Sequence, residues 1–114
     1  MKRVILDTNF IITCTKQKID FFEELKLRGI QILIPEQVIN ELIKNNAELS
    51  MKLLHQESNS FKKINIKKGH VDKRIIDYCK ENPEILVATL DKEIQNKIQN
   101  KIIIIRGKKK LEII

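Results

Sequence analysis

The chain has 114 residues, which suits a single domain spanning residues 1–114. Its formal net charge of +7 favours an acidic partner, with nucleic acid as the first candidate, although a lysine-rich surface can also serve solubility alone. No apolar run is long enough to span a membrane, and the start, Met1-Lys2-Arg3 before only three aliphatic residues, is too short for a signal peptide. We therefore expect no membrane partner.

Apolar patterning predicts strands that alternate with helices. We expect buried strands at 4–6, 30–34, 85–88 and 102–105, and a weaker edge strand at 62–66. We expect helices from residue 9 and at 19–27, 35–45, 47–56, 71–81 and 91–99. The chain then turns through the basic run 106–110 into a short apolar end at 111–114. This alternation is typical of an α/β protein with a central, mostly parallel sheet between two helical layers.

The cysteines and histidines give no metal motif. Cys14 and Cys79 form no CxxC pair, which argues against a zinc site. We expect both thiols to be reduced and buried, as in a cytoplasmic protein. His55 and His70 are isolated, and we expect them to be structural or exposed; the proximity of His70 to Asp72 leaves a supporting role open.

Four acids stand at junctions between the predicted elements. Asp7 ends the apolar run 4–6, and Asp91 follows the strand at 85–88. Ligand sites in parallel sheets lie beyond the carboxyl ends of the strands, so these two carboxylates should meet at one edge, joined by Glu41 and Asp72. Carboxylates gathered there would repel one another, and a divalent cation removes the repulsion. Oxygen ligands alone suit Mg²⁺ or Mn²⁺ rather than zinc.

Each acid also has a simpler interpretation. On a helix at 71–81, with about 100° per residue, Asp72 falls within the apolar arc, whereas Asp77 falls among lysine and arginine. We therefore expect Asp72 to point inward and Asp77 to be solvated, although a first-turn acid is also favoured by the helix dipole. Asp91 could be a plain N-cap, and Glu41, at the flank of its apolar face, could be a solvated acid. Glu93 lies away from the apolar stripe of its helix and is a weaker candidate.

Polar and basic neighbours could support such a site. Asn9 and Thr89 could orient carboxylates through hydrogen bonds, with Thr8 a weaker candidate, and ordinary capping is the alternative for all three. The clearest basic cluster for binding nucleic acid is Arg106, Lys108, Lys109 and Lys110, which could equally be a solvated turn. The chain has no aromatic ladder for base stacking, so sequence-specific readout of single strands should be weak.

In its motifs the chain resembles the PIN-domain ribonuclease superfamily. The residues that carry the resemblance are Val4-Ile5-Leu6-Asp7-Thr8-Asn9, the stretch Ile34-Pro35-Glu36-Gln37-Val38-Ile39-Asn40-Glu41-Leu42, Val71-Asp72, and Val87-Ala88-Thr89-Leu90-Asp91. Within the superfamily, it looks closest to the archaeal single-domain group related to the PIN nucleases of pre-ribosomal RNA cleavage.

The resemblance implies a three-layer PIN-like fold and cleavage of single-stranded RNA. Phosphodiester hydrolysis would use Mg²⁺ or Mn²⁺ held by Asp7, Glu41, Asp72 and Asp91, with Asp7 and Asp91 as the direct ligands. Ribosome-assembly factors would be partners of a ribosomal RNA nuclease. An antitoxin would be the partner of a toxin nuclease, and a non-catalytic RNA- or protein-binding module is a further alternative. The pair Phe21-Phe22, expected to be partly exposed, suggests a homodimer.

Overall fold

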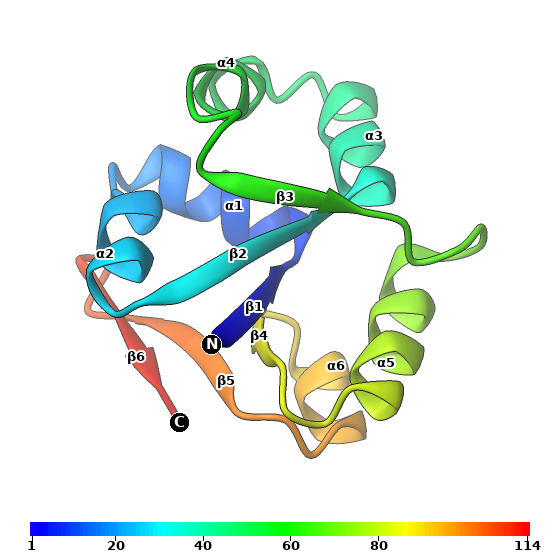
Figure 1. Ribbon diagram of the computed structural model, residues 1–114. Coiled ribbons are helices and arrows are strands. Elements are labelled where there is room, and N and C mark those ends of the chain that lie inside the picture. Colours follow the sequence, from blue (N-terminus) through cyan, green and yellow to red (C-terminus); the bar gives the residue numbers. More distant parts are fainter.

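One six-stranded sheet organises the chain in the computed structural model, which describes residues 1–114 (Figure 1). The strand order is β3-β2-β1-β4-β5-β6; the first five strands in this order are parallel and β6 is antiparallel to β5. The strands are β1 (Lys2–Leu6), β2 (Ile30–Pro35), β3 (Phe61–Ile64), β4 (Leu86–Ala88), β5 (Ile102–Arg106) and β6 (Lys110–Ile113). The predicted α/β fold class with a mostly parallel sheet is confirmed.

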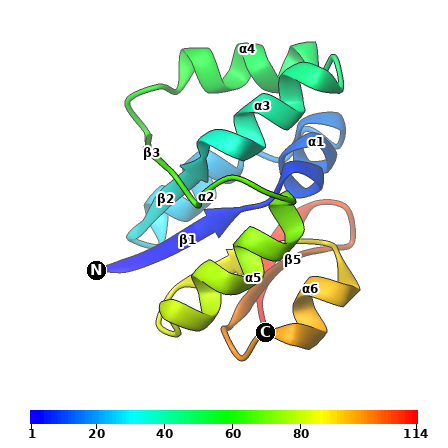
Figure 2. The same cartoon turned by 90° about the vertical axis from the view of Figure 1, so that its right-hand side faces the viewer.

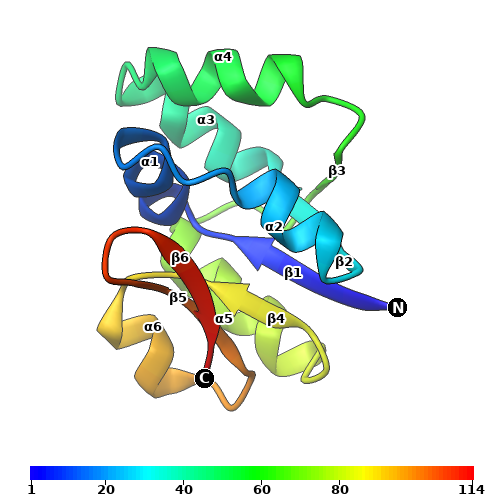
Figure 3. The same cartoon turned by 90° about the vertical axis from the view of Figure 1, so that its left-hand side faces the viewer.

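Six helices accompany the sheet. They are α1 (Thr8–Lys16), α2 (Phe21–Leu27), α3 (Glu36–Lys44), α4 (Glu48–Gln56), α5 (Val71–Glu81) and α6 (Lys92–Lys97). Figure 3 shows α1 and α2 over one face of the sheet, and Figure 2 shows α5 and α6 over the opposite face. The α3–α4 pair packs against α1. None of the six helices is both long enough and apolar enough to cross a bilayer.

The buried parts of the central strands are apolar, and helices cover both of their faces. In β1, Val4, Ile5 and Leu6 are fully buried, and Ile5 lies between Leu33 of β2 and Val87 of β4. A strand buried on both sides cannot alternate apolar and polar residues. This unbroken apolar run makes the position of β1 readable from the sequence.

The order of the strands reverses between β1 and β4. From β1 the chain moves outward to β2 and β3, and from β4 it moves the other way to β5. In open parallel sheets, this reversal leaves a crevice beyond the carboxyl ends of the two central strands. The backbone N–H of Asp7 donates to the carbonyl of Ala88 at 3.0 Å, which joins the two strands at the base of the crevice.

Two expectations about the strands need correction. The edge strand predicted at 62–66 lies at 61–64, and the apolar end forms a sixth strand that the pattern did not predict. Residues 110–113 pair with β5 through a turn in which Gly107 has a φ of +61°, a value that glycine adopts without strain. The turn of this hairpin is a basic run with one glycine. The strand forms because residues 110–113 pair with β5, which a local pattern does not predict.

The phenylalanine pair is not a dimer surface. Phe21 is fully buried and Phe22 is 3% exposed. Phe21 packs edge-on against Phe10, with ring centroids 6.3 Å apart, and stacks on Phe22 at 4.5 Å. Helical spacing alone cannot assign two adjacent aromatics to the core, but Phe21 packs against Phe10 of α1 and Phe22 against Phe61 of β3, so both are buried. The homodimer suggested from this pair therefore loses its basis.

Candidate active site

Asp7 lies at the centre of the crevice between β1 and β4. It is the N-cap of α1 and is only 4% exposed. Its Oδ1 accepts a hydrogen bond from the backbone N–H of Thr8 at 2.8 Å, and its Oδ2 accepts one from the Thr89 hydroxyl at 2.9 Å. The carboxylate is thus held in one orientation by neighbours from both strand ends.

Glu41 reaches the same crevice from α3. The hydroxyl of Thr8 donates to Glu41 Oε1 at 2.5 Å, so Thr8 joins the acid of α3 to the start of α1. Thr8 was the weaker sequence candidate for orienting a carboxylate, whereas the stronger one, Asn9, is exposed and makes no side-chain hydrogen bond. The first residue of α1, not the second, turns toward α3.

Thr89 connects two of the acids. Its hydroxyl donates to Asp7 and accepts from the backbone N–H of Asp91 at 3.1 Å, and the residue is fully buried. Asp91 is the N-cap of α6, with Oδ1 accepting from the Glu93 N–H at 2.8 Å. The capping interpretation of Asp91 is therefore correct. Its second oxygen, Oδ2, makes no hydrogen bond and stays available to a ligand.

Asp72 stands in the first turn of α5 at the same edge of the sheet, where Figure 2 places the starts of α1, α5 and α6. It is exposed, so the expectation that it points inward is wrong. The buried face of α5 is formed by Val71, Ile75, Ile76 and Cys79. The helical angle places Asp72 near this face. It does not show that the first turn of α5 extends beyond the edge of the sheet, where a side chain is exposed.

The carboxylates are close enough to alter one another's protonation. Burial raises the pKa of Asp7 to about 6, against the hydrogen bonds from Thr89 and Thr8, and the charges of Asp72 and Glu41 raise it further. Asp72 is exposed, but the surrounding protein limits its solvation and raises its pKa, and the charges of Asp91, Glu41 and Glu93 add to this effect. The four predicted acids therefore form one electrostatic group at the crevice.

Glu93 lies near this group of acids. Its position away from the apolar stripe of α6 had made it a weaker candidate for the site. It is exposed, and its carboxylate accepts a hydrogen bond from Lys97 Nζ at 3.0 Å. This lysine offsets part of its charge. The proximity of Glu93 to Asp72 depends on the contact between α5 and α6, which no spacing within either helix reveals. Asp77, by contrast, forms a surface ion pair with Arg74 at 3.5 Å.

The chemistry of the donors fits a hard divalent cation. The crevice offers carboxylate oxygens and no thiolate, since Cys14 and Cys79 are buried elsewhere in the core. No three histidine, cysteine, aspartate or glutamate side chains stand close enough to ligate one ion together. Mg²⁺ usually keeps several waters and takes only one or two carboxylates directly, so this open arrangement fits it without a closed cage.

The predicted basic cluster lies at the same edge of the sheet. Because β5 runs parallel to β1, its carboxyl end at Arg106 and the turn after it lie on the side of Asp7 (Figure 2). Arg106 Nε donates to Glu112 Oε2 at 2.5 Å, and this carboxylate raises the pKa of Arg106. Lys108, Lys109 and Lys110 are exposed and form no ion pair. The lysines, rather than the arginine, are therefore the free cations of this turn.

The protein is therefore an α/β protein with an acidic crevice. The crevice lies where the strand order of its parallel sheet reverses. The chain matches the family described as "PIN like domain" over residues 4–109. This match spans most of the chain, so the protein belongs to the PIN-domain family, as its motifs suggested.

Two relatives show how far the similarity extends. The chain is 29% identical to Ribonuclease VapC4 of Methanocaldococcus jannaschii, over 99% of this chain and 97% of the relative. It is similar to a solved structure of the PIN domain endonuclease Utp24, with a TM-score of 0.83 and 28% identity, covering 97% of this chain and 90% of that one.

Proposed function

We propose that this chain is a metal-dependent endoribonuclease that hydrolyses phosphodiester bonds in single-stranded RNA. The observation that carries the proposal is the buried Asp7 carboxylate at the strand reversal, which feels the charges of Glu41 and Asp72 and is linked to Asp91 through Thr89. Membership of the PIN family and similarity to a ribonuclease and an endonuclease support it. Excess positive charge in the rest of the chain suits a polyanionic substrate.

In this proposal the carboxylates have different tasks. Asp7 and Asp91 would hold one Mg²⁺ or Mn²⁺ ion directly, and Glu41 and Asp72 would act through water or accept a proton from the attacking water. A bound divalent cation supplies charge neutralisation at the phosphate and a more acidic water. Thr8 and Thr89 would keep Glu41 and Asp7 oriented, which spares the site the cost of ordering them during the reaction.

Cleavage of a mixed pool of RNA tests the function. Full-length chain should cut single-stranded RNA when Mn²⁺ or Mg²⁺ is present and leave it intact in chelator. Fully duplex RNA of the same sequence is the matched substrate control. Binding without any cleavage in either metal would overturn the enzyme and favour the alternative, a PIN-like module that binds RNA or protein.

Two cellular roles fit the same site. Similarity to the Utp24 structure suits ribosomal RNA processing with ribosome-assembly factors, and similarity to Ribonuclease VapC4 suits a toxin ribonuclease held by an antitoxin. Expression of the chain alone in a bacterial host separates the two roles. Growth arrest that requires Asp7 would favour the toxin, and unimpaired growth would favour processing.

Thr89→Val should weaken metal binding about 10- to 100-fold, as expected for losing a group that orients a ligand. The change removes both the donor to Asp7 and the acceptor for the Asp91 N–H while keeping the shape of the side chain. Calorimetric titration with Mn²⁺ measures the effect. Thr13→Val, on the same helix as Thr8 and without a side-chain hydrogen bond, is the control. Equal affinities of the two variants would show that Thr89 has no role in the site.

Replacing Lys108 and Lys109 by alanine should weaken RNA binding about equally for all sequences. Each lost phosphate contact should lower the slope of log affinity against log salt by about 1. Arg106→Ala should have a smaller effect because Glu112 already pairs with this guanidinium. Lys26→Ala, beside Met1 and Gly29 at the opposite edge of the sheet, is the control. An unchanged salt slope in the lysine variant would make the turn a solvated surface feature.

A further inference from the structure

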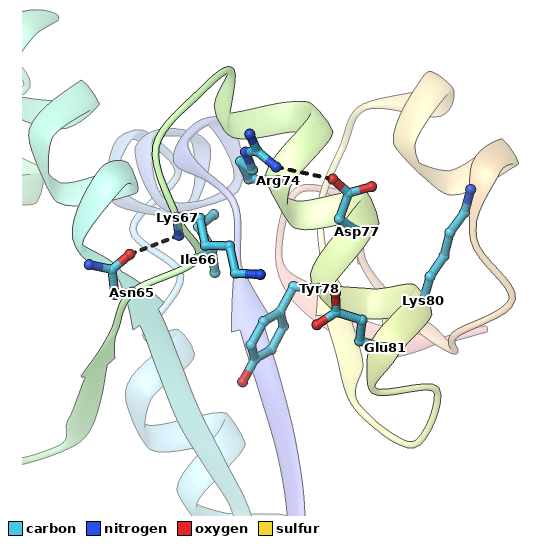
Figure 4. Close-up of a pocket in the computed structure, with 8 residues that line it drawn as sticks. All are labelled: Asn65, Ile66, Lys67, Arg74, Asp77, Tyr78, Lys80 and Glu81. Carbon is cyan, nitrogen blue, oxygen red and sulfur yellow. Dashed lines mark hydrogen bonds and ion pairs between the residues drawn. The ribbon is translucent and has the colours of Figure 1, made fainter.

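A pocket outside the acidic group lies between the 65–70 loop and α5. It has a volume of about 330 Å³, which is within the range of small-ligand pockets. Figure 4 shows Lys67 reaching from the loop toward Tyr78 on the helix, with Glu81 beside the tyrosine. None of the four candidate acids lines it, so it is separate from the site described above.

The wall formed by the loop is held firmly. Gln37 of α3 donates to Asn65 Oδ1 at 3.0 Å and accepts from the backbone N–H of Ile66 at 3.3 Å. From the other side, Arg74 Nε donates to the carbonyl of Lys68 at 2.6 Å. Gly69 has a φ of +132°, a conformation that favours glycine, and a Cβ there would also come within 2.8 Å of the Arg74 guanidinium. A pocket with fixed walls can bind a ligand at little ordering cost.

The side chains in the pocket suit a flat group that carries hydrogen-bond donors. Tyr78 is the only tyrosine in a chain without tryptophan, its side chain is partly exposed, and its hydroxyl makes no hydrogen bond. An aromatic face with a free polar end suits stacking on a nucleobase. Arg74 pairs with Asp77, so the exposed Glu81 carboxylate is the free acceptor in the pocket and can take hydrogen bonds from the amino groups of a base. Lys67, which forms no ion pair, can contact a phosphate at the rim.

Two helices, α3 and α5, connect the pocket to the acids over a short distance. Tyr78 lies six residues after Asp72 on α5, about 9 Å along the helix axis. Gln37, which fixes the loop, lies one turn before Glu41 on α3. The loop itself carries Lys67 and Lys68, both exposed. A single-stranded RNA with one phosphate at the acids can therefore pass these lysines and place a neighbouring base against Tyr78.

We propose that the pocket formed by the 65–70 loop and α5 binds an unpaired base of the RNA, stacked on Tyr78, next to the nucleotide at the acidic site. The proposal rests on the proposed RNA cleavage for its substrate. It also supplies a base contact that the lack of an aromatic ladder seemed to exclude. Such a contact requires a single strand, because a base in a duplex cannot leave its stack without cost.

The single tyrosine makes a direct test feasible. Full-length chain carrying 3-fluorotyrosine and Asp7→Asn, which keeps RNA intact, should show one ¹⁹F resonance. Adding single-stranded RNA of about ten nucleotides, a length within the usual range of single-strand sites, with Mg²⁺ should shift this resonance as binding saturates. Fluorescence anisotropy of labelled RNA measures total binding in the same samples. A resonance that stays in place while RNA saturates the protein would overturn the proposal.

Variants supply a second measurement. In the same Asp7→Asn background, Tyr78→Leu should weaken binding about tenfold, as expected for losing one stacked base, and Tyr78→Phe should bind as tightly as its parent. Thermal melts establish that the variants fold, and the ¹⁹F result does not depend on them. Cleavage by the wild-type chain without a ¹⁹F shift would reject the pocket and keep the nuclease. A shift without cleavage would keep the pocket and reject the nuclease, and equal binding by all three proteins would reject the pocket.

Discussion

Asp7→Asn should reduce metal-dependent RNA cleavage by about 10²-fold or more, the scale seen when one preorganised charge-stabilising group is lost. The amide keeps the size of the side chain and can still accept from the Thr8 N–H, but it removes the buried charge that a cation would neutralise. Initial rates of cleavage of a labelled single-stranded RNA in Mn²⁺ measure the effect.

Asp77→Asn is the matched control, because it makes the same chemical change on the surface of α5. Asp77 pairs with Arg74 across 3.5 Å of partly exposed surface, and exposed pairs contribute little to stability. The cleavage rate of Asp77→Asn should stay within about twofold of wild type, a much smaller change than the loss of a catalytic group causes. Equal losses in both variants would mean that the strand-end carboxylate has no special part in the reaction.

The layers of the fold could be predicted because burial on both faces leaves a strong mark on the sequence. The buried end of β1 and the whole of β4 are short apolar runs followed directly by polar residues, so the strands and the acids at their ends could be predicted. β6 has no such mark, since it is an antiparallel strand at the edge of the sheet and Leu111 is its only buried residue. Pairing across a turn decided its structure.

The candidate site divides in the same way. Asp7 and Asp91 follow from the direction of parallel strands, which brings all carboxyl ends to one edge. The bond between Thr8 and Glu41 depends on how α3 crosses α1, and the exposure of Asp72 depends on where α5 leaves the sheet. The pocket at Tyr78 depends on a loop fixed by Gln37 and Arg74, a contact between three segments that no local pattern encodes.

The largest expected effect on stability concerns the pH dependence of folding without metal. Asp7 has a pKa of about 6 in the folded chain against an ordinary value of 3.8. Below the lower value, both folded and unfolded chains carry the proton and no penalty exists. As the pH rises from about 4 to about 6, the unfolded chain loses its proton first, so the free energy of unfolding falls. By pH 7, the loss reaches about 3 kcal/mol at 1.36 kcal/mol per pKa unit.

Asp7→Asn should remove this pH dependence and leave the metal-free protein more stable than wild type at pH 7. Urea unfolding at several pH values in chelator measures both effects, with Asp77→Asn as the control that keeps the wild-type profile. Millimolar Mg²⁺ or Mn²⁺ should raise the stability of the wild type near neutral pH, because an ion that binds only the folded crevice shifts the equilibrium and lets Asp7 ionise without penalty. The Asp7→Asn variant should respond weakly. A wild-type free energy of unfolding that neither falls with rising pH nor rises with metal would contradict a buried, charged Asp7 in a cation-binding crevice, and binding of RNA by the basic surface alone would then be the better account of this protein.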